Sequence, residues 1–205
     1  MAIACPINLD VSRLRDEVGE TYSRLVKDPE GDFHFHHGLD YACEFLRYDR
    51  QELESLPTEC TARFAGLGNP HRAGSIQPGE TVLDIGCGAG TDLLLAARRT
   101  GPGGKAIGVD ATQAMQELAA SCAQQAALSE RVEIRAGRTE ELPVDDASID
   151  VVISNGVLNL APDKRVAFGE IVRVLRPGGK LYLADVVIQE ELSQVSRSDA
   201  ELWAS

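Results

Sequence analysis

The sequence predicts an α/β fold: an open parallel sheet with helices on both faces and a helical N-terminal extension. From residue 81 onward, short apolar runs rich in Val, Ile and Leu alternate with helical segments. The runs mostly lack polar–apolar alternation, which is typical of strands buried on both faces of a parallel sheet. Residues 1 to 75 read as helices and loops instead. We therefore divide the chain into a helical extension, residues 1–75, that serves as a substrate lid, and a sheet domain, residues 76–205.

The extension is expected to hold three helices. Apolar residues recur with helical spacing from Val11 to Val26, and Pro29 ends that helix. A second helix is expected from Leu39 towards Leu46, and a third from Asp49 to Leu56. The composition of Phe64–Pro70 indicates a loop that approaches the sheet.

The sheet domain is expected to hold five strands and three helices. The strands are Thr81–Ile85, Lys105–Val109, Val132–Arg135, Ile149–Ile153 and Lys180–Val186. The helices are Gly90–Arg99, Thr112–Ala127 and Asp163–Leu175. Strand–helix alternation implies right-handed crossovers and an open parallel sheet. We expect its strand order to be 3-2-1-4-5. Two Pro-Gly-Gly turns, residues 102–104 and 177–179, are expected to lead into the second and last strands.

Charge and cysteine content exclude several classes of partner. With 20 basic and 32 acidic residues, the net charge of −12 repels phosphate backbones, so nucleic-acid and membrane partners are not expected and a small-molecule substrate is. The five cysteines include no C-x-x-C pair, and we expect neither a disulfide framework nor a metal site. Charged residues follow the N-terminus too soon for a signal peptide, and no apolar run could span a membrane, which favours a cytoplasmic protein.

The strongest motif is D-x-G-x-G-x-G, from Asp84 to Gly90, between the first strand and a helix. Glycines at such a turn let the backbone approach a ligand, and the helix N-terminus offers free N–H groups. Asp110 ends the next strand, 20 residues after Gly90, where an acidic residue can accept both hydroxyls of a ribose. Together these features make the fold Rossmann-like and predict a cofactor that contains adenosine.

The acidic residue before the glycines favours S-adenosylmethionine among such cofactors. A dinucleotide fingerprint is G-x-G-x-x-G, with a pyrophosphate on the helix, and Asp84 would repel that pyrophosphate. The same carboxylate could receive the ammonium group of a methionine moiety. A nicotinamide-dependent oxidoreductase remains an alternative, although no Tyr-x-x-x-Lys catalytic pair accompanies the turn. A tight turn without a ligand is a further alternative.

Several motifs of the sheet domain resemble class I methyltransferases, over roughly Gly79 to Val186. The residues that carry the resemblance are Asp84–Gly90, Gly108–Asp110, Glu140–Pro143 and Arg173–Gly179. Within that class the chain is similar to the arsenite methyltransferase family, through Phe64–Pro70, Ser154–Lys164 and Leu183–Val186. The resemblance implies S-adenosylmethionine as cofactor and methyl transfer as the reaction.

The resemblance also implies a set of cofactor-binding positions around the predicted turn. They are Asp84, Gly86, Cys87, Gly88, Gly90, Asp110, Ala111, Thr112, Met115, Arg138, Thr139, Glu140, Ser154, Asn155 and Val157. Cys87 is expected to pack there as a small residue rather than to act as a nucleophile. Asp92 either helps to hold the first helix and the cofactor or is a solvated first-turn residue that the helix dipole stabilises.

The cysteines that bind arsenic in the arsenite methyltransferase family are not matched here. Two of their positions resemble Gly156 and Leu67, and a third would fall beyond Ser205. Neither glycine nor leucine can bind arsenic. We therefore carry over the fold and the cofactor from the resemblance, but not the arsenic activity.

The acceptor side is expected to involve Asn155 and the extension. We name His34, His36 and Asn155 as candidate catalytic residues, either histidine serving as a general base if the acceptor is protonated. Tyr22 and Tyr41 are further lid candidates. A cofactor-binding module with reduced catalysis is the main alternative to an active methyltransferase.

The C-terminal end raises a question of oligomeric state. Class I methyltransferases commonly add a β-hairpin after the fifth strand, whereas residues 187–205 read as a loop and a short helix ending at Leu202 and Trp203. The hairpin is therefore expected to be absent, leaving the edge of the last strand uncovered. An uncovered edge favours pairing, so we expect a homodimer through that strand.

Overall fold

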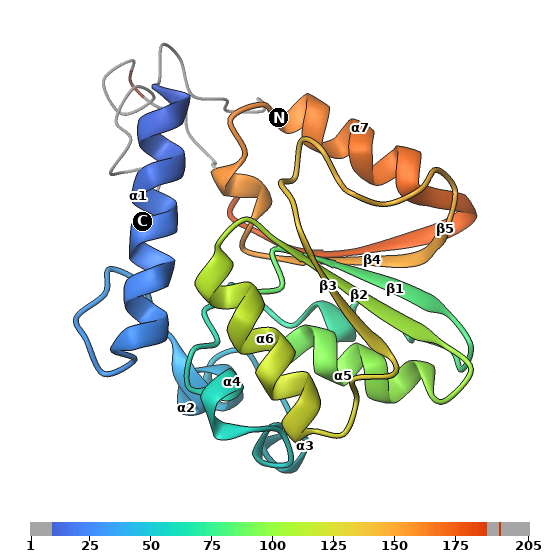
Figure 1. The fold of residues 1–205 in the computed structure, drawn as a ribbon, viewed down its shortest axis with the longest axis horizontal. Helices are drawn as coiled ribbons and strands as arrows, with labels where there is room; N and C mark the ends of the chain where they lie inside the picture. Colours follow the sequence, from blue (N-terminus) through green and yellow to red (C-terminus); the bar gives the residue numbers. More distant parts are fainter. Residues whose placement is uncertain (1–9, 188–192, 194–205) are drawn as a thin grey trace.

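The computed structural model of the protein describes residues 10–187 and 193. Its centre is a parallel five-stranded sheet of order β3-β2-β1-β4-β5, which confirms the predicted order (Figure 1). The strands are β1 Thr81–Ile85, β2 Lys105–Asp110, β3 Val132–Ala136, β4 Ile149–Asn155 and β5 Leu175–Ala184. The chain order reverses between β1 and β4, and ligands bind at such a switch point, beyond the carboxyl ends of the strands.

Helices precede and flank the sheet. Those of the extension are α1 Val11–Lys27, α2 Gly38–Glu44, α3 Arg50–Glu54, α4 Thr58–Thr61 and the 3₁₀ turn η1 Pro70–Arg72. Those of the sheet domain are α5 Thr91–Thr100, α6 Gln113–Gln125, the 3₁₀ turn η2 Leu158–Leu160 and α7 Lys164–Val174. Sequence periodicity missed α4, η1 and η2 because elements of three or four residues are too short to show a period.

The helices cover opposite faces of the sheet, with α5 and α6 on one side and α7 on the other (Figure 1). Two apolar clusters fill the two interfaces. Val82 belongs to the first cluster, whereas Leu83 and Ile85 belong to the second, because successive strand residues point to opposite faces. By the same alternation, Asp84 points to the face that α5 covers.

The extension packs on the α5–α6 face as part of the same body. Leu25, Leu53 and Phe64 are buried in one cluster with Leu93 of α5. Helix α1 runs beside α6 (Figure 1). The division of the chain at residue 75 stays a prediction, since the apolar core continues across it.

The last strand differs from its expected form. β5 begins at Leu175 rather than at Lys180, so the expected Pro177–Gly179 turn falls inside the strand. The register shifts there, because Ile149 pairs with Leu175 while Val151 pairs with Lys180. The intervening residues bulge out, with Gly178 at a φ of 83°. No strand follows β5 among the residues that the structure describes, and the expected helix ending at Leu202 and Trp203 lies outside them.

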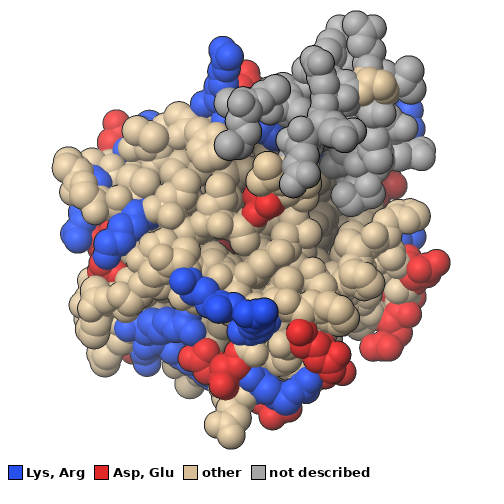
Figure 2. Space-filling view, turned by 180° about the vertical axis from the view of Figure 1, so that it is seen from behind, with Lys and Arg blue, Asp and Glu red and all other residues tan. Residues whose placement is uncertain are grey.

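The surface mixes charges of both signs. Figure 2 shows a largely uncharged upper centre, with basic and acidic side chains side by side over the lower part of that face. Among the described residues, no helix is both long and apolar enough to cross a membrane.

Candidate active site

The Gly-rich turn joins β1 to α5 at the carboxyl edge of the sheet. The backbone N–H groups of Gly86 and Cys87 both donate to the carbonyl oxygen of Val109, at 2.7 and 3.1 Å, which fixes the turn against β2. A Cβ on Gly86, whose φ is 66°, would lie 2.4 Å from a methyl carbon of Val157. Only glycine therefore fits there. Gly90 caps α5 in the left-handed conformation.

Asp110 faces this turn from the end of β2. Its Oδ2 accepts a hydrogen bond from the N–H of Gly88 at 2.9 Å, and its Oδ1 accepts one from the N–H of Thr112 at 2.8 Å. Burial raises the pKa of Asp110, while these backbone donors oppose the rise. The two donors hold the carboxylate in one orientation, and a carboxylate retains lone pairs for further hydrogen bonds.

Asp84 is a buried acidic residue of the site, and one of its carboxylate oxygens lacks a hydrogen-bond partner in the described part of the chain. The residue is 2% exposed, and its Oδ2 has no hydrogen-bond partner among the described residues. Burial raises its pKa well above the ordinary value, the negative charges of Asp92 and Asp110 add to the rise, and a backbone hydrogen bond from Leu93 opposes it only in part. A buried carboxylate without a partner is costly unless a cation compensates it. Asp84 is thus suited to receive a positively charged group.

A cavity opens over the turn and brings most of the predicted cofactor residues together. Those that line it are Asp84, Gly86, Cys87, Gly88, Asp110, Ala111, Thr112, Met115, Arg138, Thr139, Glu140, Asn155 and Val157. Gly90 and Ser154 are not part of the lining. Gly90 is used at the helix cap, and Ser154 is fully buried within β4.

The side chain of Asn155 is engaged within the protein. Its Oδ1 accepts from the N–H groups of Leu67 and Gly68 at 2.8 and 3.1 Å, and its Nδ2 donates to the carbonyl of Gly68 at 2.9 Å. A Cβ on Gly66 would lie 2.2 Å from Nδ2, so the loop can approach only with glycine there. Asn155 lines the cavity, but its polar atoms hold the loop Phe64–Pro70 rather than point to a free acceptor.

The same asparagine belongs to a buried polar network around Asp92. Asp92 Oδ2 accepts from Asn155 Nδ2 at 2.9 Å, Asp92 Oδ1 accepts from the Tyr48 hydroxyl at 2.7 Å, and His71 Nε2 lies 3.1 Å from Oδ1. Burial raises the pKa of Asp92, but His71, Asn155 and Tyr48 outweigh it and hold the pKa below the ordinary value. Asp92 is 6% exposed, so it is not the solvated first-turn residue that one reading of the sequence allowed.

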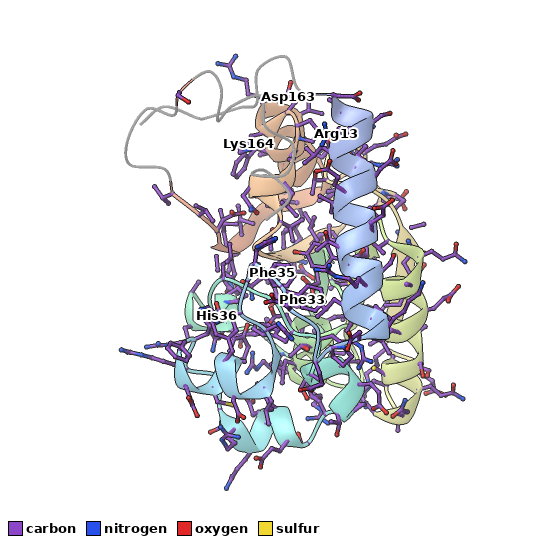
Figure 3. All side chains as sticks on the ribbon, turned by 90° about the vertical axis from the view of Figure 1, so that its left-hand side faces the viewer. Arg13, Phe33, Phe35, His36, Asp163 and Lys164 are labelled. Carbon is purple, nitrogen blue, oxygen red and sulfur yellow. The ribbon has the colours of Figure 1, made fainter. Side chains whose placement is uncertain are left out.

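The structure does not bring His34 and His36 to the cavity. Both are exposed, and His36 stacks on Phe45 with ring centroids 6.3 Å apart. Phe33 and Phe35 alternate with the histidines and pack inward, nearer to α1 than His36 lies (Figure 3). In an extended segment, successive side chains point to opposite sides. Because burying the two phenylalanines is more favourable than burying the two histidines, the histidines point outward.

Helix α1 contributes lining residues that sequence reasoning did not single out. Leu14, Arg15, Val18 and Gly19 line the cavity together with Tyr22, which was a lid candidate. Tyr41 instead packs beside His36 and Phe45, outside the lining. The i, i+3, i+4 spacing of the α1 residues was visible in the sequence, but it does not say whether the shared face meets a core or a cavity.

The fold and the site define a class of protein. A Gly-rich turn after β1, an oriented Asp110 at the end of β2 and a buried Asp84 with one oxygen that the described residues leave unsatisfied, in a parallel sheet of order 3-2-1-4-5, are the features of a class I methyltransferase domain. The chain belongs to the methyltransferase domain family, whose model matches residues 76–205. S-adenosylmethionine is the cofactor of this class, as the sequence predicted.

Known arsenite methyltransferases are among the relatives. The chain is 47% identical over 146 residues to an arsenite methyltransferase of Halobacterium salinarum, covering 70% of this chain and 36% of the relative. It is 28% identical over 204 residues to the mouse arsenite methyltransferase, covering 95% of this chain and 53% of the relative. The chain thus spans between about a third and about half of the length of these curated relatives.

Solved structures of methyltransferases also resemble this chain. An arsenic(III) S-adenosylmethionine methyltransferase from Chlamydomonas reinhardtii matches with a TM-score of 0.66 and 37% identity, covering 72% of this chain and 51% of that one. A methyltransferase from Aquifex aeolicus, titled as dependent on S-adenosylmethionine, matches with a TM-score of 0.50 and 25% identity, over 54% of this chain and 60% of that one.

Proposed function

We propose that the chain transfers a methyl group from S-adenosylmethionine to a small-molecule acceptor. The single observation that carries the proposal is Asp84, a buried carboxylate in the cavity lining with an oxygen that no described residue satisfies. A cofactor with an ammonium group and a sulfonium, and without a phosphate, supplies the missing cation. A pyrophosphate at the same place would add negative charge beside Asp84 and Asp110.

The residues present fit such a cofactor. Asp84 would take the ammonium group, Gly86 and Gly88 would give the methionine moiety access to the backbone, and Asp110 would accept from the ribose. Arg138, Thr139 and Glu140 line the end of the cavity where the adenine is expected. When bound, the cofactor supplies an electrophilic methyl carbon with a neutral leaving group.

The work left to the chain is to position the acceptor and exclude water. On one side, α1 provides Leu14 and Val18, and across the cavity Leu160, Ala161 and Pro162 follow β4. These apolar side chains favour a small acceptor with an apolar body. Asn155 keeps the loop Phe64–Pro70 closed against β4, which makes it a positioning residue in this proposal rather than a catalytic one.

Thiolate capture of arsenite is not part of the proposal. Leu67 and Gly156, which resemble two arsenic-binding positions of the related family, lie against each other: a Cβ on Gly156 would be 2.9 Å from Leu67 Cγ. An apolar contact therefore occupies the place where paired thiols would be needed. Arsenite nevertheless belongs in an acceptor screen, because the relatives are named for it.

Two further expectations belong to the proposal. The sheet edge at β5 is offered as the contact of a homodimer, and the cytoplasm as the compartment. Light scattering over a range of concentrations tests the dimer: a mass of two chains supports it, and a single-chain mass at high concentration excludes it.

Turnover is tested by measuring S-adenosylhomocysteine formation with a panel of small acceptors that includes thiols, amines, phenols and arsenite. Product with at least one acceptor, absent without protein and in Asp110→Ala, supports the proposed activity. Cofactor binding without product from any acceptor class would favour the alternative, a cofactor-binding module with reduced catalysis.

A further inference from the structure

Gly19 is a glycine in the interior of a long helix, and it faces the cavity. It lies near the middle of the 17-residue α1, on the side that contributes to the cavity lining. Glycine is among the least favourable residues inside a helix, because it loses the most backbone entropy on folding. A glycine at this position therefore lowers the stability of α1, which raises the question of what benefit in its surroundings offsets this cost.

The protein itself supplies no such reason at Gly19. Its backbone is helical and is not one of the glycines with a positive φ. Apart from its chain neighbours and the backbone of its own helix, a Cβ added there would meet no heavy atom of the described residues within 4 Å. Gly66 and Gly86 behave differently, since added Cβ atoms would lie 2.2 and 2.4 Å from Asn155 and Val157. Neither backbone strain nor a close neighbour among the described residues therefore requires glycine at position 19.

The neighbours of Gly19 on the same helix face show which part of the cavity it overlooks. Arg15, one turn earlier, has an Nη2 atom 3.4 Å from Glu140 Oε1. Tyr22, almost one turn later, has its pKa raised to about 12 by burial and by the nearby charge of Asp110. Residues spaced by three and four lie on one face of a helix. Gly19 thus lies between Arg15, which pairs with Glu140, and Tyr22, which lines the cavity together with Asp110, at the adenosine end of the proposed site.

We propose that Gly19 is a specificity-determining residue whose missing side chain leaves room for the adenosine half of the cofactor. The inference rests on the proposed function, because the space is assigned to that cofactor. A larger residue would fill space that only the ligand uses, so it would weaken binding without disturbing the packing of the ligand-free protein.

Two substitutions and one control test this inference. Gly19→Ala and Gly19→Leu both introduce good helix formers, so each should raise the melting temperature of the ligand-free protein, by about 2 to 4 °C. Glu20→Leu places the same side chain one residue along α1, at an exposed position. Calorimetric titration with S-adenosylhomocysteine gives the dissociation constant of each variant. We expect a loss of roughly tenfold for Gly19→Ala, a hundredfold or more for Gly19→Leu, and wild-type affinity for Glu20→Leu.

The outcomes separate the inference from the function on which it rests. If the wild-type protein binds S-adenosylhomocysteine and Gly19→Leu binds it equally well, the role of Gly19 is wrong while the proposed cofactor stands. If the wild-type protein does not bind, the proposed function fails and takes this inference with it. If circular dichroism shows that Gly19→Leu is unfolded, Gly19→Ala decides, since unchanged affinity there contradicts the proposal.

Discussion

Asn155 Nδ2 donates a hydrogen bond to Asp92 Oδ2 at 2.9 Å, which joins the end of β4 to the first turn of α5. The same amide group donates to the carbonyl of Gly68. One side chain thereby links three segments that surround the cavity: the helix after the Gly-rich turn, the end of β4 and the loop Phe64–Pro70. The helix after the Gly-rich turn and the loop Phe64–Pro70 are therefore held together through this buried contact.

Removing the Tyr48 hydroxyl should weaken this link. In Tyr48→Phe, Asp92 Oδ1 loses its 2.7 Å hydrogen bond inside the protein, and a buried acceptor that loses a donor costs about 1 to 3 kcal/mol. The free energy of unfolding, measured by urea denaturation, should fall by that amount. Tyr41→Phe is the matched control, because the Tyr41 ring packs with His36 and Phe45 away from this network. Its free energy of unfolding should be close to that of the wild-type protein. Equal stabilities of the two variants would contradict the importance of the network.

The buried Asp84 should make the cofactor-free protein less stable as pH rises. Its pKa is raised in the folded state, so the native protein binds more protons than the unfolded chain between the unfolded and folded pKa values. Stability therefore falls as pH increases through that window, and the penalty persists above it. Asp84→Asn removes the charge, so its melting temperature at pH 7 should exceed that of the wild-type protein. The difference should shrink towards pH 4.

The same substitution should weaken cofactor binding, because the cation loses its partner. We expect Asp84→Asn to combine a gain in stability with a loss of affinity for S-adenosylmethionine, because residues that serve a binding site often lower the stability of the free protein. Unchanged affinity would show that the carboxylate does not bind the cofactor, and lowered stability at pH 7 would contradict the cost assigned to its burial.

Asp110 should contribute to affinity through its oriented carboxylate. Removing it in Asp110→Ala takes away charge-assisted acceptors worth about 3 kcal/mol, or roughly a hundredfold in the dissociation constant of S-adenosylmethionine. Asp145→Ala serves as control, since Asp145 is an exposed aspartate away from the cavity lining. Similar dissociation constants for both variants would show that Asp110 does not contribute to cofactor binding.

The candidate bases of the extension should prove dispensable. His34 and His36 are exposed and lie outside the cavity lining. We therefore expect His34→Ala and His36→Ala to keep kcat within about twofold for any acceptor found, since general-base catalysis contributes about 10²–10⁴ and its loss would be obvious. A drop of a hundredfold, relieved at high pH, would restore one of them as the general base.

Local signals in the sequence were enough for the sheet and the turn. β1 matches its predicted bounds, and the other strands except β5 begin at the predicted residue, because buried strands carry continuous apolar runs. The start of β5 was misplaced because Pro177-Gly178-Gly179 resembles a turn, whereas the strand accommodates it as a bulge. Most of the predicted cofactor positions line one cavity, because the glycines and Asp110 depend on local geometry that the sequence reveals.

Contacts between distant segments were beyond reach of the sequence alone. Tyr48 and Asn155 are separated by 107 residues, and no spacing rule links them to Asp92 or His71. We predicted that Asn155 faces the acceptor because it lies at the end of β4. Its polar atoms instead form hydrogen bonds with the loop at Leu67 and Gly68. His34 and His36 were singled out for their chemistry, while burial of the alternating Phe33 and Phe35 decided their direction.

The most direct test of the central claim is a calorimetric titration of the wild-type protein with S-adenosylmethionine and, separately, with NAD. The buried Asp84, with one carboxylate oxygen that no described residue satisfies, predicts micromolar binding of the cationic cofactor and no detectable binding of the dinucleotide. Binding of NAD alone would contradict the account and favour an oxidoreductase. Binding of neither would mean that the Gly-rich turn is structural in this chain.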